Sequence, residues 1–257
     1  FEKSFLEVKG NSNLKARFYV SASGSSGTLA AGDYLKDHLS LKIAVVEATE
    51  CPTLLNNGYG EHNIQGIGDK HVPLIHNVMN TDFVVGISDQ ATNNLNMIFN
   101  TEIGQRYLTA KKGLDVELIN RLPEFGFSTI ANILASIKLA KYMNLGKDDA
   151  IITVATDGAD LYLSELEKTK KEFKGIYDES MCAEIYGQYL KGISTDHTLE
   201  LNQKEKERIF NLGYYTWVEQ QGIDLEDFEK RRDQNFWNDH FQKMLSLDNR
   251  VKEFNNI

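Results

Sequence analysis

The sequence predicts an α/β protein in which a mostly parallel, twisted sheet carries helices on both faces, with a helical C-terminal extension. Two observations predict this three-layer fold. Short apolar and β-branched runs alternate with longer segments of helical periodicity, and Gly/Ser-rich or polar turns follow the runs. Beyond about residue 161 the pattern is helical almost throughout. We therefore expect an α/β domain at residues 1–165 and a helical extension at residues 166–257 that packs on it.

The first predicted unit is a strand, a helix and a second strand. Residues 16–20 form an apolar and aromatic run, residues 29–39 carry helix formers with an apolar repeat, and residues 41–48 form a second β-branched run. Two strands joined by a helix make a right-handed crossover in a parallel sheet. In such sheets, ligands collect beyond the carboxyl ends of the strands.

The turn between the first strand and its helix has the composition of a phosphate-binding loop. It contains Gly24, Ser25, Ser26, Gly27 and Thr28. The glycines allow the backbone to approach an anion, its N–H groups and the helix dipole favour negative charge, and the hydroxyls can donate further hydrogen bonds. Because the turn has no lysine, it is not a Walker A loop, and we expect it to hold a phosphate without a metal. The alternative is an ordinary strand-to-helix connection.

The middle of the chain supplies a long loop, two more strands and several helices. The loop at residues 50–68 is rich in glycine and has no clear period, which is typical of a functional or mobile segment. The elements predicted after it are a strand at 81–87 with Ser88 as helix N-cap, helices at 89–111 and 114–122, a helix from about 130 that Gly146 closes, and a strand at 149–155. That last strand ends in a polar turn at residues 156–160.

The C-terminal third is predicted to be helical. Asn202 with Glu205 three residues later is a start similar to a capping box, Gly222 ends that helix, and Asp224 begins another. The aromatic residues of this region are expected to pack rather than to do chemistry. The extension is expected to cap the sheet or to form a subunit contact.

Composition excludes several functional classes. The net charge of −9 argues against nucleic-acid binding, and no apolar run is long enough for a transmembrane helix. Cys51 and Cys182 lie far apart in the sequence, which indicates a reducing, cytoplasmic compartment. The histidines form no ligand-spaced cluster, so no metal site is expected. We expect a cytoplasmic protein that binds neither nucleic acid nor membranes.

Three motifs in a fixed order identify a family. They are Gly24-Ser25-Ser26-Gly27-Thr28, then His62-Asn63-Ile64-Gln65-Gly66-Ile67-Gly68, and then Ile151-Ile152-Thr153-Val154-Ala155-Thr156-Asp157-Gly158. This order resembles the C-terminal part of the cysteine synthase and cystathionine β-synthase branch of the pyridoxal-phosphate enzymes, which have the tryptophan synthase β fold (fold type II). The resemblance covers about residues 1–165.

The resemblance implies a site for pyridoxal 5′-phosphate. The five residues of the turn, Gly24, Ser25, Ser26, Gly27 and Thr28, would bind the cofactor phosphate. Gly66, Ile67 and Gly68 would line the cofactor chiefly through backbone, with Gln65 in the substrate cleft. Thr156 is the expected partner of the pyridine nitrogen and Asp157 the alternative, because the family's usual serine position is Gly158 here.

The largest departure from the family is a missing lysine. In the family, the Schiff-base lysine and the loop that binds the substrate carboxylate precede the phosphate turn, but only fifteen residues precede the first strand here. Lys70 beside the glycine loop matches no catalytic position. We therefore expect this chain, which starts with Phe1, to be the C-terminal part of a longer enzyme and to be inactive alone, with no catalytic residue of its own.

The function implied is β-elimination or β-replacement on an amino-acid substrate, in a homodimer that could include a missing N-terminal segment or partner subunit. Cysteine synthesis, other β-replacements, lyases and thiolases all remain open. One alternative is a nucleotide or sugar-phosphate binder that uses Glu47 for a ribose, although the turn lacks Gly-x-Gly-x-x-Gly. The other is a non-catalytic scaffold subunit with the same fold.

Overall fold

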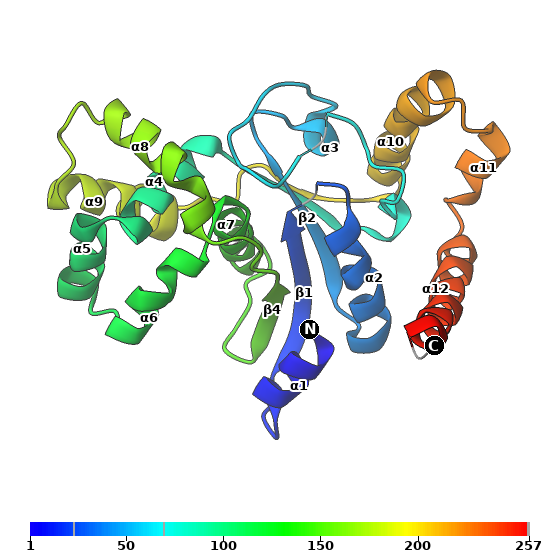
Figure 1. Ribbon diagram of the computed structural model, residues 1–257, viewed down its shortest axis with the longest axis horizontal. Coiled ribbons are helices and arrows are strands. Elements are labelled where there is room, and N and C mark those ends of the chain that lie inside the picture. Colours follow the sequence, from blue (N-terminus) through cyan, green and yellow to red (C-terminus); the bar gives the residue numbers. More distant parts are fainter. Residues whose placement is uncertain (23, 69, 256–257) are drawn as a thin grey trace.

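The sheet has five strands in the order β4-β1-β2-β3-β5 (Figure 1). The computed structural model describes residues 1–22, 24–68 and 70–255. The strands are β1 (Lys15–Ala22), β2 (Lys42–Ala48), β3 (Phe83–Ile87), β4 (Asp149–Thr153) and β5 (Thr198–Glu200). β1 pairs in parallel with both β2 and β4, and β2 pairs in parallel with β3. The predicted α/β fold with a mostly parallel sheet is confirmed.

One strand lies inside the segment that was expected to be helical. β5 pairs antiparallel with β3, from Phe83 opposite Glu200 to Val85 opposite Thr198. It is only three residues long, and a run that short shows no alternation that a sequence pattern can detect. The C-terminal extension is therefore helical almost throughout, as the sequence predicts, and β5 is an edge strand that the sequence pattern did not mark.

The helices follow the predicted order with some changes of boundary. The α-helices are α1 (Glu2–Lys9), α2 (Gly27–Leu39), α3 (Thr53–Asn56), α4 (Asp89–Asn100), α5 (Glu102–Lys112), α6 (Val116–Arg121), α7 (Phe127–Tyr142), α8 (Leu163–Glu172), α9 (Glu179–Ile185), α10 (Gln203–Tyr214), α11 (Leu225–Lys230) and α12 (Gln234–Asn255). Short 3₁₀ turns occupy Val78–Asn80, Leu122–Glu124 and Ala159–Tyr162, and π turns occupy Tyr186–Lys191 and Tyr215–Gln220.

Local hydrogen bonds explain where the helices begin and end. Ser88 caps α4 as predicted, accepting from Ala91 N at 3.2 Å, and Asn202 accepts from Glu205 N at 3.0 Å. The single helix predicted at 89–111 is two helices, because Thr101 leaves the helical conformation and caps α5 by accepting from Gly104 N at 3.1 Å. α7 ends at Tyr142 rather than at Gly146, with Asn144 in the left-handed conformation just beyond it.

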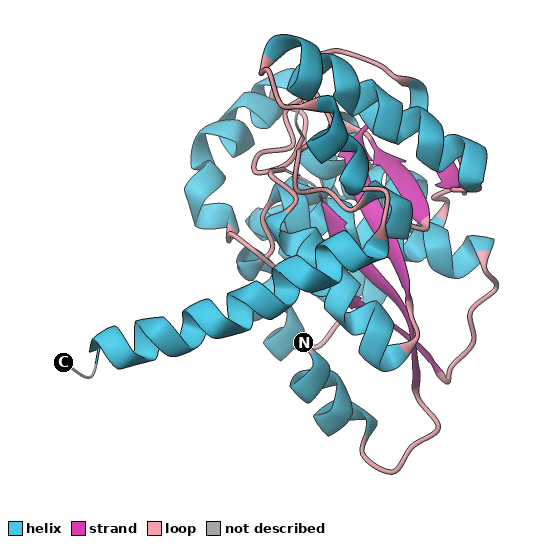
Figure 2. Cartoon of the chain, turned by 90° about the vertical axis from the view of Figure 1, so that its right-hand side faces the viewer, coloured by secondary structure: helices cyan, strands magenta, loops and turns pink. Residues whose placement is uncertain are grey.

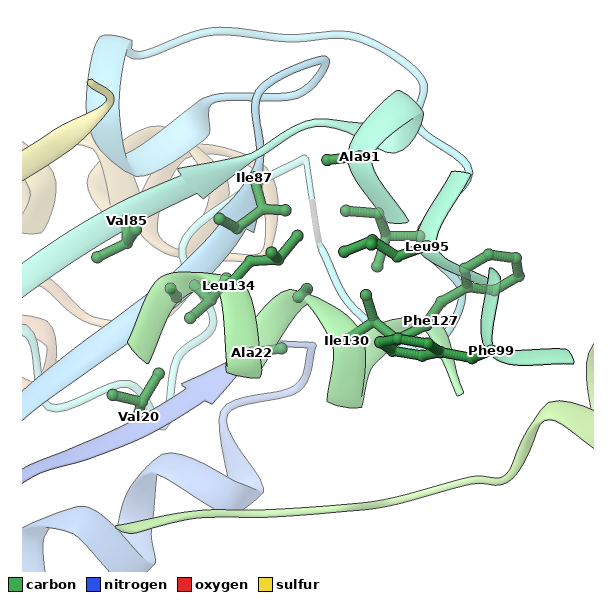
Figure 3. Close-up of a cluster of buried hydrophobic side chains, with 14 of the residues drawn as sticks. Val20, Ala22, Val85, Ile87, Ala91, Leu95, Phe99, Phe127, Ile130 and Leu134 are labelled. Atoms are coloured by element: carbon green, nitrogen blue, oxygen red, sulfur yellow. The ribbon is translucent and has the colours of Figure 1, made fainter. Parts of the chain in front are cut away.

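Side chains of β1 alternate between two hydrophobic cores. Phe18 and Val20 point to the face covered by α7 and α4, whereas Tyr19 points to the opposite face with Leu35 of α2. Figure 3 shows the first core, where Val20 and Ala22 of β1 meet Phe127, Ile130 and Leu134 of α7 and Leu95 of α4. α2 and α7 therefore approach the same edge of the sheet from opposite faces.

The C-terminal extension contributes to both faces. Cys182 and Ile185 of α9 join the core on the α7 face, whereas Phe210 of α10 and Phe228 of α11 join the core on the α2 face. Figure 1 shows α8 and α9 on one side of the sheet and α10 to α12 on the other. None of the helices in the described part of the chain combines the length and apolar character that crossing a membrane needs.

Candidate functional site

A cavity of about 110 Å³ opens at the carboxyl ends of β1 and β4. Its lining residues are Ala22, Gly24, Ser25, Ser26, Gly27, Thr28, Gly66, Ser128, Asn132, Val154 and Thr156. The strand order reverses at this point, since the chain continues from β1 to β2 on one side and β4 lies on the other. A topological switch point of this kind is where open parallel sheets bind ligands. The cavity therefore lies where both the topology and the first motif predicted a site.

One wall of the cavity is the turn that leads into α2. Ser26 is buried and adopts the left-handed conformation, with φ at 66°, as the residue before the helix. The first turn of α2 is tied to β1, since Ser21 Oγ donates to Thr28 Oγ1 at 2.7 Å and Tyr19 OH donates to Thr28 O at 2.9 Å. Burial raises the pKa of Tyr19, so this hydroxyl remains a donor. The turn thus holds the helix N-terminus rigidly against the cavity.

The opposite wall is the N-terminus of α7, which sequence reasoning missed. Ser128 and Asn132, one turn apart, both line the cavity. Asn132 Oδ1 accepts from Ala22 N at 2.7 Å, and Asn132 Nδ2 donates to Val154 O at 3.0 Å. This amide therefore bridges the diverging ends of β1 and β4. An asparagine between the apolar residues Ile130 and Leu134 of the predicted helix was the available signal.

The polar turn after β4 contains Thr156 and Asp157, the two residues expected as possible partners of the pyridine nitrogen, and the structure places them differently. Thr156 lines the cavity, with its Oγ1 2.6 Å from Ser128 Oγ and its N–H donating to Thr129 Oγ1 at 3.2 Å. Asp157 is not among the lining residues, and its carboxylate accepts from Tyr162 OH at 3.2 Å. Burial raises the pKa of Tyr162, and Asp157 contributes to that shift. Of the two residues, only Thr156 lines the cavity.

The glycine loop reaches the cavity at a single described residue. Gly66 lines the cavity with φ at 79°, and a Cβ on Gly24 would lie 3.5 Å from Gly66 O, so loop and turn are close. Ile67 instead points into the core, and Gln65 is exposed. Gly68 also has positive φ and packs so tightly on His62 that a Cβ would lie 2.2 Å from its Nε2. The structure brings none of these last three to the cavity wall.

Asp89 anchors the glycine loop and was also missed. Asn63 N donates to Asp89 Oδ2 at 2.6 Å, and Ile64 N donates to Asp89 Oδ1 at 3.0 Å. Burial raises the pKa of Asp89, and the nearby Glu50 adds to that shift. The carboxylate at the start of α4 therefore fixes the backbone that precedes Gly66. Its position directly after the predicted cap Ser88 was the only sequence signal.

The donor set of the cavity fits a phosphate ester. Hydroxyls from both walls line it, and its described lining residues include no carboxylate and no ammonium group. The first turns of α2 and α7, both fully described, contain no acidic residue, and neither helix has a side-chain cap. Two helix N-termini that face one cavity can stabilise an anion without a lysine. We therefore conclude that the residues present suit a phosphate group.

Lys70 and Glu47, which the sequence analysis considered, make contacts outside the cavity. Lys70 Nζ lies 4.8 Å from the Tyr59 ring centroid and 4.0 Å from Glu61 Oε1. Glu47, offered above as a ribose ligand, is buried beneath α3, where it accepts from Leu54 N at 2.9 Å and Leu55 N at 2.8 Å. Within the described residues, no three His, Cys, Asp or Glu side chains gather where they could hold a metal ion. The contacts of Glu47 weigh against the nucleotide alternative.

Glu47 should make stability depend on pH. Burial raises the pKa of its carboxyl from 4.5 to about 7, against the opposing effects of the Leu54 and Leu55 N–H groups and Arg208. The native state therefore holds a proton that the unfolded state has lost, so the free energy of unfolding falls as pH rises from about 4.5 to about 7. The slope reaches about 1.4 kcal/mol per pH unit at its steepest. Glu47→Gln should remove this contribution.

Urea unfolding of wild type and Glu47→Gln across this pH range measures the effect. Subtracting one stability curve from the other removes the contributions of other titrating groups. Among these are Asp33, whose pKa is raised by burial, and His76, whose pKa is lowered by burial. If the two stability curves run parallel between pH 4.5 and 7, Glu47 does not titrate as its burial requires.

Comparisons with known proteins agree with the motifs. No protein-family model matches the chain. Cysteine synthase B of Campylobacter jejuni is 32% identical over 161 residues, which are 62% of this chain and 46% of that protein. The crystal structure of cysteine synthase (OASS) from Entamoeba histolytica superposes with a TM-score of 0.51 at 26% identity, over 74% of this chain and 48% of that one.

The resemblance of the chain to the cysteine synthase group is confirmed, and the enzymes of that group use pyridoxal phosphate. The chain spans a little under half the length of the curated relative that it matches.

Proposed function

We propose that this cysteine synthase homologue is the cofactor-binding part of an enzyme that catalyses β-elimination or β-replacement on an amino acid with pyridoxal 5′-phosphate. The observation that carries the proposal is the cavity at the switch point. There the N-termini of α2 and α7 meet from opposite faces of the sheet, and hydroxyls surround the space between them. That arrangement suits a phosphate held without a metal.

Each residue has a definite part in this proposal. Ser25, Ser26 and Thr28, with the N–H groups of the turn and Gly24 and Gly27 giving close backbone approach, hold the phosphate. Thr156, positioned by Ser128 2.6 Å away, bonds the pyridine nitrogen, and Gly66 brings backbone against the cofactor. When bound, pyridoxal phosphate supplies an electron-withdrawing ring that stabilises negative charge at the substrate α-carbon. Gln65, exposed on the loop, would contact the substrate.

The lysine that binds the cofactor aldehyde is the remaining part. Of the described residues that line the cavity, none is a lysine. We place the lysine in a segment outside residues 1–257, so that the chain alone binds cofactor without turning over substrate. The active assembly is a homodimer in this proposal. The same phosphate-binding cavity would serve cysteine synthesis, other β-replacements, lyase reactions and thiolase reactions. These reactions would differ in the residues that face the substrate.

The test is a titration of the chain with pyridoxal phosphate, followed by the absorbance of the bound cofactor. Pyridoxal without its phosphate should bind at least tenfold more weakly, by about 1.4 kcal/mol. Ser25→Ala should weaken the phosphorylated form about fivefold, because one exposed hydrogen bond is worth about 1 kcal/mol. Ser164→Ala, at the exposed start of α8 and away from the cavity, is the matched control and should have no effect.

Two results would reverse the proposal. Equal affinity for pyridoxal and for pyridoxal phosphate would mean that the cavity does not hold the phosphate group. Tighter binding of a simple sugar phosphate than of pyridoxal phosphate would support the phosphate-ligand alternative instead.

The full-length protein tests the position of the lysine. Borohydride reduction followed by peptide mapping should label a lysine outside residues 1–257. A label on Lys70 or another lysine of this chain would contradict that placement. Absence of any label would favour the scaffold alternative.

A further inference from the structure

α12 leaves the body of the protein as a long, isolated helix. It has 22 residues, and Figure 2 shows its C-terminal end extending away from the sheet and its covering helices. Its first turns are attached, since Trp237 Nε1 donates to Arg231 O at 2.9 Å and the Phe241 ring lies 6.1 Å from that of Tyr34 in α2. Beyond that point, residues 242–244 and 246–255 are exposed to solvent.

The projecting part carries an apolar stripe that a solvent-exposed helix does not need. Met244, Leu247, Val251 and Phe254 are 58%, 44%, 56% and 76% exposed. Their spacing of three, four and three residues is that of a and d positions in a heptad, and stepping back seven from Met244 reaches Trp237. A seam of large apolar residues at a and d is the pattern by which one helix packs against another.

The charges beside the seam select the partner and its direction. With Met244 and Val251 at a positions, Lys243 and Arg250 fall at g and Asp248 at e. In a parallel pair, a g residue of one helix faces the e residue that lies five positions later on the other helix. Lys243 of one copy would therefore face Asp248 of the second copy. In an antiparallel pair, g residues face each other, so that Lys243 would meet Arg250. The seam is therefore self-complementary in the parallel direction.

We propose that α12 pairs in parallel with α12 of a second copy of this chain. This inference deepens the homodimer proposed above by giving it a surface, and it does not depend on the cofactor. The seam is shorter than three heptads, so the pair is weak, with a dissociation constant of about 1–100 µM. The dimer therefore forms and dissociates over a concentration range that ultracentrifugation can cover.

Sedimentation velocity of the full chain tests the interface. The weight-average mass should rise from monomer toward dimer between about 1 and 100 µM. Leu247→Glu should weaken the association at least about 30-fold, because it removes one buried leucine from each helix. Leu118→Glu is the matched control, since Leu118 of α6 is 43% exposed and Leu247 is 44% exposed. It should leave the dimer intact.

Two further variants test the direction. Lys243→Glu should weaken the dimer threefold to tenfold, roughly the effect of replacing two exposed ion pairs by repulsions. The double exchange of Lys243→Glu with Asp248→Lys should restore it. Val251→Cys should form a disulfide between copies under oxidation, because identical a positions adjoin only in a parallel pair.

The outcomes are decisive in either direction. A monomer at every concentration, or a dimer that Leu247→Glu leaves unchanged, overturns the proposal. A dimer that requires Leu247 but shows no Val251→Cys disulfide and no rescue by charge exchange overturns the parallel arrangement. None of these readings depends on whether pyridoxal phosphate binds, so failure here and failure of the proposed function are separate results.

Discussion

Replacing Gly126 by alanine should both destabilise the protein and weaken binding of pyridoxal phosphate at the proposed site. Gly126 is buried directly before α7, and a Cβ there would lie 2.5 Å from Asp157 O and 2.8 Å from the Tyr162 ring. A side chain has no room there because Gly126 N donates to the Asp157 carbonyl oxygen at 2.9 Å, which holds the two backbones together. A rigid backbone atom cannot move aside cheaply, so we expect a loss of about 3 kcal/mol in the free energy of unfolding.

The functional part of this effect follows from what the contact holds together. The hydrogen bond joins the start of α7 to the turn after β4, and these two segments carry Ser128 and Thr156. Separating them should break the 2.6 Å contact between the two hydroxyls and weaken binding of pyridoxal phosphate by about 100-fold, or about 2.7 kcal/mol.

Urea unfolding and cofactor titration measure the two effects on the same sample. Gly187→Ala is the matched control, because Gly187 lies in a helical turn and a Cβ there would meet nothing within 4 Å. It should change neither quantity by more than about 0.5 kcal/mol. If Gly126→Ala binds cofactor normally, the junction of α7 with the β4 turn does not shape the site.

The sequence located one half of the cavity and not the other. The turn at residues 24–28 could be located because its information is local: small residues between a strand run and a helix run are typical of a phosphate turn. Ser128 and Asn132 lie about a hundred residues further on, in a helix whose pattern indicates only a buried apolar stripe. They lie near β1 only because α7 packs on the face of the sheet opposite α2, and this tertiary contact cannot be read from the local sequence.

The errors in the fold have a related cause. Residues 89–111 keep an apolar period throughout, so nothing in the pattern marks the break at Thr101. The helix ends there because Thr101 adopts extended backbone angles and its side chain caps α5. α5 approaches the end of α4 so tightly that a Cβ on Gly104 would lie 2.2 Å from Ile98 O. Similarly, β5 exists because β3 offers it an edge, and its three residues carry too little pattern of their own.

Replacing Thr156 by valine should weaken cofactor binding roughly tenfold to 100-fold and change the absorbance of the bound cofactor. Valine keeps the shape of threonine and removes its hydroxyl, so the cavity loses the group that we assign to the pyridine nitrogen. Ser128 Oγ, 2.6 Å away, also loses its partner, which adds to the cost. Thr156 is exposed, so folding should be preserved.

Asp157→Asn is the discriminating companion, because Asp157 was the alternative partner for the same nitrogen. Its carboxylate accepts from Tyr162 OH at 3.2 Å and does not line the cavity, so the amide should alter affinity less than threefold, or by less than about 0.7 kcal/mol. Thr156→Ser, which restores a hydroxyl at the same position, should recover both the affinity and the absorbance.

The absorbance makes this test independent of turnover. A residue that only shaped the cavity would change affinity and leave the spectrum of the bound cofactor unchanged. A residue bonded to the pyridine nitrogen must alter the electron distribution of the ring and therefore its spectrum. A spectral change with Asp157→Asn and none with Thr156→Val would assign the nitrogen to Asp157 and require the turn after β4 to rearrange when the cofactor binds.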